Sequence, residues 1–273
     1  MKQRIITGLL LGSVAITLMC IGGWVLGLAM ALIVCLGIYE AYHVLSAAGH
    51  RPASWPTWAG VAAALPAVLI WGVKTVIPLL MLICLLMLVC VLFRREPKLE
   101  DVAMSMLPLF TVLLPGMCMM SLLAIEPYQL RLTLLFMMIA IPCLGDIAAY
   151  FVGSKVGGPK LCPPVSPNKT ISGSIAGLAG SIIGAVVVQS VAWLACGDAV
   201  RVLLPTWWEC LLLGLLGGAA GQVGDLCFSL IKRHCGVKDY SNIFPGHGGM
   251  LDRMDSVLFM CLVLFCYRMM TVL

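Results

Sequence analysis

Charged residues are scarce in this chain. Lysine and arginine number 17 and aspartate and glutamate 12 among 273 residues, and the mean hydropathy is +1.07. A soluble domain of this length needs far more charge to cover its surface, so the composition excludes an ordinary soluble protein. The apolar runs are long enough for membrane-spanning helices rather than barrel strands. The sequence therefore predicts an all-α, polytopic integral membrane protein.

Motifs that mark familiar soluble sites are also missing. No two cysteines have CxxC spacing, and neither HExxH nor a zinc-type Cys/His pattern occurs. Pro159 stands where a P-loop requires its lysine, and residues 246–251 lack the last glycine of GxGxxG. Most of the 13 cysteines lie in apolar runs, which indicates packing rather than disulfides. The net charge of +5 is explained by loops on one side of the membrane, so nothing supports nucleic-acid binding.

Charges, prolines and glycines divide the apolar sequence into about nine predicted spans. The first run follows Lys2 and Arg4 and is too long for a signal peptide, so we interpret it as a retained helix. Gly22-Gly23 is the only break between the first two spans. The predicted spans are residues 5–21, 23–46, 56–73, 75–93, 102–124, 131–153, 171–196, 206–231 and 253–271.

The distribution of positive charge orients these spans. With a cytoplasmic N-terminus, 13 of the 17 lysines and arginines fall in inner segments, as the positive-inside rule requires. The two long inner loops, 154–170 and 232–252, hold the polar and Gly/Pro-rich sequence. We therefore expect residues 1–93 to be scaffold helices, or a dimer or lipid-facing part, and residues 102–273 to be the catalytic transmembrane domain.

The first polar stretch runs from Gly145 to Gly153. Asp146 lies inside a predicted span, and Tyr150 follows at i+4 on the same helical face. A carboxylate within a span is a functional-site candidate by default. The alternative is an Asp paired with a neighbouring lysine or a backbone group.

The second polar stretch is the loop that leads into the span at residue 171. Lys169 and Thr170 precede the predicted helix, and Ser166 lies just before them. A lysine, hydroxyls and the free N–H groups of a helix start suit an anion. A capped helix with an interfacial lysine explains the same pattern.

The third stretch surrounds the second long loop. Asp225, Ser229 and Lys232 lie at i, i+4 and i+7 on one helical face, and Asp252 and Asp255 open the last span. Carboxylates are favoured at a helix start without any metal, so Asp255 has a capping explanation. Asp225 lies within its span and has none. Asp225 and Asp252 fit a Mg²⁺ ion, which takes one or two carboxylates and fills its shell with water and phosphate.

The glycine-rich turn Pro245–Gly249 lies between these carboxylates. Its glycines allow backbone N–H groups to approach a phosphate closely. His247 is a candidate phosphate donor or a solvated loop side chain.

At these positions the chain resembles phosphatidate cytidylyltransferase, also called CDP-diacylglycerol synthase. The likeness extends over about residues 140–256. Its residues are Asp146 with Ala149-Tyr150 and Gly153, Ser166 to Thr170, Gly224 to Ser229, Lys232-Arg233, Lys238-Asp239, Pro245 to Gly249, and Asp252-Arg253-Met254-Asp255.

This resemblance implies CMP transfer from CTP to phosphatidate with Mg²⁺, and a second, monovalent cation such as K⁺. It implies a membrane lipid substrate and a bacterial inner membrane with the site facing the cytosol. The sequence leaves the oligomeric state open, with a homodimer as one alternative. Catalytic roles are implied for Lys169, Asp225, Lys232, Arg233 and Asp252. Substrate contacts are implied for Asp146, Tyr150, Ser166, Thr170, Ser229, Lys238, Asp239, His247, Gly248, Gly249, Arg253 and Asp255.

Two other functions fit parts of the pattern. Carboxylates within spans also mark ion paths of transporters, although no internal repeat is visible. A cytidylyltransferase or kinase that acts on a polyprenyl or isoprenoid-ether phosphate would share the same head-group site. Both remain alternatives on the sequence alone.

Overall fold

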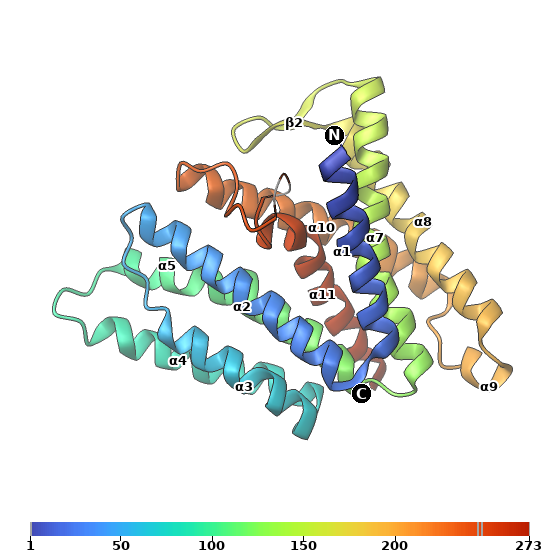
Figure 1. Ribbon diagram of the computed structural model, residues 1–273, viewed down its shortest axis with the longest axis horizontal. Coiled ribbons are helices and arrows are strands. Elements are labelled where there is room, and N and C mark those ends of the chain that lie inside the picture. The colour runs from blue at the N-terminus through green and yellow to red at the C-terminus, as the bar shows by residue number, and fades with distance from the viewer. Residues whose placement is uncertain (1, 245, 247, 273) are drawn as a thin grey trace. The chain divides into compact units, whose positions relative to one another are not determined.

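The computed structural model describes residues 2–244, 246 and 248–272, and this part is almost entirely helical (Figure 1). The all-α prediction is confirmed. The longer helices are α1 (Lys2–Ile21), α2 (Gly23–Ala47), α3 (Trp55–Trp71), α4 (Val76–Leu92), α5 (Leu99–Pro108), α6 (Leu114–Ser121), α7 (Tyr128–Val156), α8 (Ile171–Ala195), α10 (Trp207–His234) and α11 (Leu251–Val272). Short elements are the helical turns Val73–Thr75, Leu109–Leu113 and Leu122–Ala124, the strands β1 (Lys160–Cys162) and β2 (Ser166–Thr170), and α9 (Asp198–Arg201).

The helices have the length and apolarity of a polytopic membrane protein. Seven segments of the described chain are long and apolar enough to cross a membrane. Helices also occupy the other two predicted positions, but their apolar parts are shorter, at Gly12–Ile21 and Trp55–Trp71. The count of nine spans and the cytoplasmic N-terminus therefore stay predictions.

The chain folds as two compact units. The first contains Met1–Ala124 and Ile231–Met254, and the second contains Ile125–Leu230 and Asp255–Leu273. The polar segment after α10 thus belongs to the same unit as the N-terminal helices. The expected division into residues 1–93 and 102–273 concerns function, and it stays a prediction.

The first unit packs α2 to α6 around an apolar core. Met87, Leu113 and Met117 are fully buried there, so all three side chains pack in this core. Gly22 and Gly23 both have positive φ angles, 65° and 55°, which glycine adopts without strain. The predicted break between the first two helices is therefore a turn that this glycine pair makes possible.

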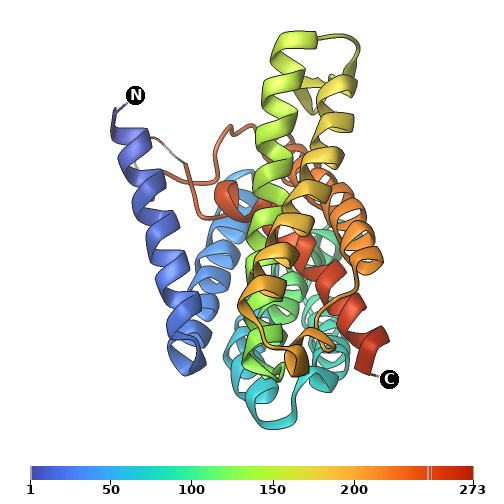
Figure 2. The same cartoon turned by 90° about the vertical axis from the view of Figure 1, so that its right-hand side faces the viewer.

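The second unit is built on α7 and α8, which lie side by side (Figure 2). Glycines along both helices allow close backbone approach, as is common between membrane helices. The predicted inner loop between them forms an antiparallel hairpin in which Lys160 pairs with Thr170 and Cys162 with Ser166.

Replacing Gly180 by valine should lower the free energy of unfolding by about 1–3 kcal/mol. A Cβ atom at Gly180 of α8 would lie 2.6 Å from both Ala148 Cβ and Leu144 O of α7. Thermal unfolding of the purified protein measures the loss. Gly12→Val is the control, because a Cβ there meets no atom within 4 Å in the described part of the chain. Equal losses in both variants would contradict this account.

Candidate active site

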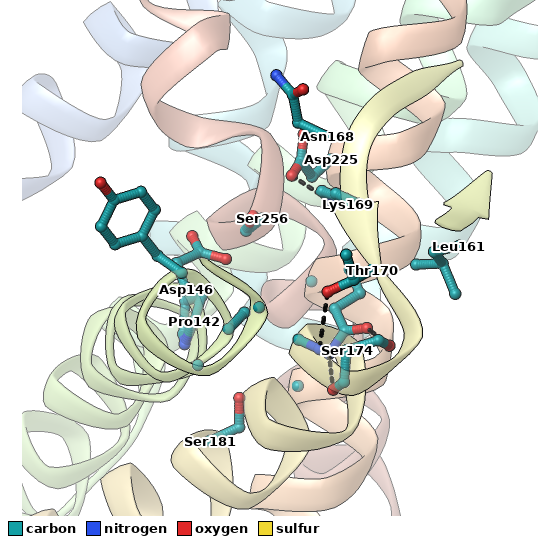
Figure 3. A pocket seen from close by; sticks show the side chains of 18 of the residues that line it. Pro142, Asp146, Leu161, Asn168, Lys169, Thr170, Ser174, Ser181, Asp225 and Ser256 are labelled. Carbon is teal, nitrogen blue, oxygen red and sulfur yellow. Dashed lines mark hydrogen bonds and ion pairs between the residues drawn. The ribbon is translucent and has the colours of Figure 1, made fainter. Parts of the chain in front are cut away.

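A cavity of about 500 Å³ opens in the second unit (Figure 3). Its walls come from α7, β1, β2, α8, α10 and α11. The volume is in the range of sites that hold small molecules. Its polar lining consists of Asp146, Tyr150, Ser154, Asn168, Lys169, Thr170, Ser174, Ser181, Gln222, Asp225 and Ser256.

Five residues predicted from separate stretches line this one cavity. They are Asp146, Tyr150, Lys169, Thr170 and Asp225. Lys169 and Asp225 form an ion pair, and their side chains are 29% and 26% exposed (Figure 3). The structure therefore brings two carboxylates and a lysine to the same walls.

The position of Lys169 follows from local structure. It lies on β2, directly before Thr170, which caps α8: Thr170 Oγ1 accepts a hydrogen bond from Gly173 N at 3.1 Å. Threonine is a favoured N-cap because its side chain satisfies a free N–H of the first turn. The cap predicted for this helix is thus confirmed, and it does not exclude an anion site at the same place.

Gln222 is a cavity residue that the sequence analysis missed. Its Nε2 donates to Ser174 O at 3.0 Å, and its Oε1 accepts from Ser174 Oγ, so it joins α10 to α8. Gln222 lies three residues before Asp225, which puts both on one helical face. That spacing is the signal that could have identified it.

Three predicted residues of the second unit lie outside the cavity lining. Ser229 donates to Asp225 Oδ1 at 3.4 Å and so supports a lining residue from the next turn of α10. Asp255 accepts from the backbone N of Ser256 at 2.7 Å, but it is the fifth residue of α11 and lies beyond the first turn, so the capping explanation for Asp255 is wrong. Ser166 lies in β2, where it pairs with Cys162.

The remaining predicted residues belong to the first unit and centre on Asp252. Lys232 Nζ lies 2.6 Å from Asp252 Oδ1, and their side chains are 11% and 4% exposed. Asp252 Oδ2 accepts from the backbone N of Tyr240 and of Gly249, each at 2.9 Å. The Tyr240 ring also lies 5.6 Å below Lys232 Nζ, within reach of a cation–π contact.

The other loop residues are placed in different ways. Gly248, with φ of 78°, pairs with Phe244 across the turn, where Phe244 N donates to Gly248 O at 3.0 Å. His247 lies outside the described residues, so its predicted role stays a prediction. Four predicted residues around this loop have exposed side chains, namely Arg233, Lys238, Asp239 and Arg253.

The donor set of the cavity fits a divalent cation with phosphate oxygens. Within the described residues no three His, Cys, Asp or Glu side chains form a ready metal cluster. A Mg²⁺ site needs only one or two carboxylates and keeps positions for water and phosphate. Asp146 and Asp225 supply two carboxylates to one cavity, and Lys169 supplies a positive charge for an anion.

This chain matches a cytidylyltransferase family and relatives that are named phosphatidate cytidylyltransferase. The cytidylyltransferase family matches residues 2–271. A phosphatidate cytidylyltransferase of Bacillus subtilis is 32% identical over 274 residues, covering 95% of this chain and 94% of the relative. One of Synechocystis is 33% identical over 295 residues, covering 94% and 92%.

A Brucella suis phosphatidate cytidylyltransferase is more similar over a shorter stretch. It is 39% identical over 142 residues, which cover 52% of this chain. In this match the chain spans about half the length of the relative, 48%. None of these three relatives is named as a transporter or as an enzyme of another lipid, so they lend no support to the two alternatives.

Proposed function

The chain belongs to the cytidylyltransferase family, and we propose that it transfers CMP from CTP to phosphatidate, giving CDP-diacylglycerol and pyrophosphate. The observation that carries the proposal is a polar cavity, lined by Lys169, Asp146 and Asp225, within a membrane protein of this family. Two relatives named for this activity align along more than nine-tenths of their length.

The reaction needs charge stabilisation more than a strong base. A phosphatidate oxygen, already anionic near neutral pH, attacks the α-phosphorus of CTP. The bond from that phosphorus to the bridging oxygen of the β-phosphate breaks, and pyrophosphate leaves with the electron pair. Fixed positive charges aimed at the phosphates lower this barrier, because catalysis here comes from positioning and electrostatics. We propose that Lys169 offsets the negative charge of the substrate phosphates in the cavity. Lys232 and Arg233, at the end of α10, are proposed to offset the same negative charge.

Mg²⁺ is the proposed cofactor, with a monovalent cation such as K⁺ as a second ion. When bound, Mg²⁺ would neutralise triphosphate charge. Asp225 is the ligand that we propose, because its carboxylate lines the cavity. Asp252 stays the predicted second ligand, although Lys232 Nζ already lies 2.6 Å from its Oδ1.

The location follows from the substrates. CTP is a cytosolic nucleotide and phosphatidate is a membrane lipid, so we propose a bacterial inner membrane with the site facing the cytosol. The bacterial relatives and the excess of lysine and arginine in the predicted inner segments support this. A homodimer stays one alternative for the oligomeric state.

Purified protein given CTP and phosphatidate should form a lipid product only when Mg²⁺ is present. CTP labelled at the α-phosphorus should deliver its label to the lipid, since CMP is the group transferred. CTP labelled at the γ-phosphorus should leave its label in pyrophosphate. Chelation of Mg²⁺ should abolish both products.

The controls separate the alternative functions. A lipid labelled from the γ-phosphorus would identify a kinase and contradict the proposal. Transfer of CMP to polyprenyl phosphate, with no transfer to phosphatidate, would show that the lipid acceptor is not phosphatidate. CTP with Mg²⁺ should also raise the unfolding temperature, since a ligand that binds only the folded state stabilises it. A transporter without a nucleotide site would form no labelled lipid, and CTP with Mg²⁺ would not change its unfolding temperature.

A further inference from the structure

Glu40 is a buried carboxylate in the part of the chain that was expected to be scaffold. It lies in α2, and only 1% of its surface is exposed. An ionisable side chain within an apolar span is costly to keep and points to a functional role. The cavity in the second unit does not include it.

Three hydrogen bonds join Glu40 to the segment that runs from the end of α10 to the start of α11. Ser241 Oγ donates to Glu40 Oε1 at 2.5 Å, and Met250 N donates to the same oxygen at 2.8 Å. Leu251 N, at the start of α11, donates to Oε2 at 2.8 Å. The carboxylate of α2 thus caps a helix more than two hundred residues later in the chain, and negative charge is favoured at such a terminus.

Glu40 and Asp252 accept from neighbouring backbone donors of this segment. Asp252 accepts from the backbone N of Tyr240 and Gly249, and Glu40 accepts from those of Met250 and Leu251. Three consecutive N–H groups, from residue 249 to residue 251, therefore end on two carboxylates. Hydrogen bonds to a charged acceptor are stronger than neutral ones.

Gly249 shows how closely Glu40 approaches this segment. A Cβ atom at Gly249 would lie 2.5 Å from Glu40 Oε1 and 2.8 Å from Oε2. No side chain fits there while Glu40 stays in place. Glycine at this position therefore lets the backbone come close to the Glu40 carboxylate.

We propose that Glu40 is a positioning residue for CMP transfer. It fixes both ends of the residue 241–251 segment. In this way it holds Asp252 and its ion-pair partner Lys232 in the positions that CMP transfer requires. This inference rests on the proposed function, but the tether itself can be measured without any activity. Glu40 acts through other residues and contacts no substrate.

Amide hydrogen exchange of the intact protein tests the tether. Glu40→Gln should speed exchange at Met250 and Leu251 about tenfold or more, because a neutral amide is a weaker acceptor and turns one donor toward the N–H groups. Glu40→Ala should speed it further. The control Asp101→Asn changes a carboxylate that is 8% exposed and pairs with Arg94, so exchange at residues 250 and 251 should stay at the wild-type rate.

Turnover distinguishes positioning from simple packing. Loss of the tether should lower kcat by about a hundredfold, the scale of an ångström-level misplacement, with KM for CTP changed by less than about threefold. Glu40→Asp keeps the charge and should retain more activity than Glu40→Gln, which keeps the shape. A packing role predicts the opposite order.

The hydrogen-exchange result tests the tether, and the turnover result tests its role in CMP transfer. Wild-type exchange at Met250 and Leu251 in Glu40→Ala, or wild-type kcat in Glu40→Gln, would overturn the inference. If the Glu40 variants do not fold, Ser241→Ala removes one of the three donors and should lower kcat about fivefold; unchanged turnover there would also overturn it. A wild-type protein that makes no CDP-diacylglycerol would refute the proposed function, while the exchange data would still report on the tether.

Discussion

Asp225→Asn should lower kcat/KM for CMP transfer by about a thousandfold at saturating Mg²⁺, the scale at which removal of one electrostatic group from an active site is felt. The substitution keeps the shape of the side chain and removes its charge. Asp225 lines the cavity and pairs with Lys169, so its loss removes a proposed cation ligand and releases that lysine. Radiolabel transfer from CTP to lipid measures the effect.

The matched control is Asp198→Asn. Asp198 belongs to the same unit and also forms an ion pair, with Arg201 at 2.7 Å, but its side chain is 95% exposed and lies outside the cavity. Its substitution should leave turnover unchanged, because exposed ion pairs contribute little. Near-normal turnover of Asp225→Asn would remove Asp225 from the proposed mechanism. Equal losses in both variants would show that the assay reports general damage.

The local features of this protein could be predicted because each depends on residues close together in the sequence. Long apolar runs gave the helices, and Gly22-Gly23 gave the break between the first two. Spacing at i and i+4 placed Tyr150 beside Asp146 on one face, and both line the cavity. Thr170 marks the start of α8 for the physical reason expected, a side-chain oxygen that accepts from the first turn.

Features that depend on distant residues could not be read in the same way. Glu40 follows a long uncharged run, and nothing near it indicates that its partners are Ser241, Met250 and Leu251. The bond between Gln222 and Ser174 likewise joins two helices. Apolar periodicity carries little information on which helices meet, since apolar residues occupy most of the surface of a membrane helix. A carboxylate within the predicted span 23–46 was nevertheless a signal for Glu40.

Asp252→Asn should reduce both stability and turnover. Removing this carboxylate leaves Lys232 charged at 11% exposure and weakens the acceptor for Tyr240 N and Gly249 N. Loss of one partner from a buried ion pair typically costs about 3–5 kcal/mol, because the remaining charge is uncompensated. Thermal unfolding of the purified protein measures the first effect, and CMP transfer per folded molecule measures the second.

Lys232→Met changes the other member of this ion pair, and Asp101→Asn is the control in a different ion pair. Lys232→Met leaves Asp252 with two backbone donors, so it should destabilise less than Asp252→Asn. The double variant should cost less than the sum of the two, because the groups interact directly. Asp101→Asn breaks an ion pair in which Arg94 is 29% exposed and can be hydrated. It should therefore lower the free energy of unfolding by less than Asp252→Asn does.

A Mg²⁺ titration separates the structural role of Asp252 from the predicted metal role. If Asp252 is a ligand, Asp252→Asn needs more Mg²⁺ for half-maximal turnover, and Lys232→Met needs no more than the wild type. Additive losses in the double variant would contradict a functional Lys232–Asp252 pair. An unchanged Mg²⁺ requirement in Asp252→Asn would limit this carboxylate to holding Lys232, Tyr240 and Gly249 in place, and it would leave Asp225 as the proposed ligand of the cavity.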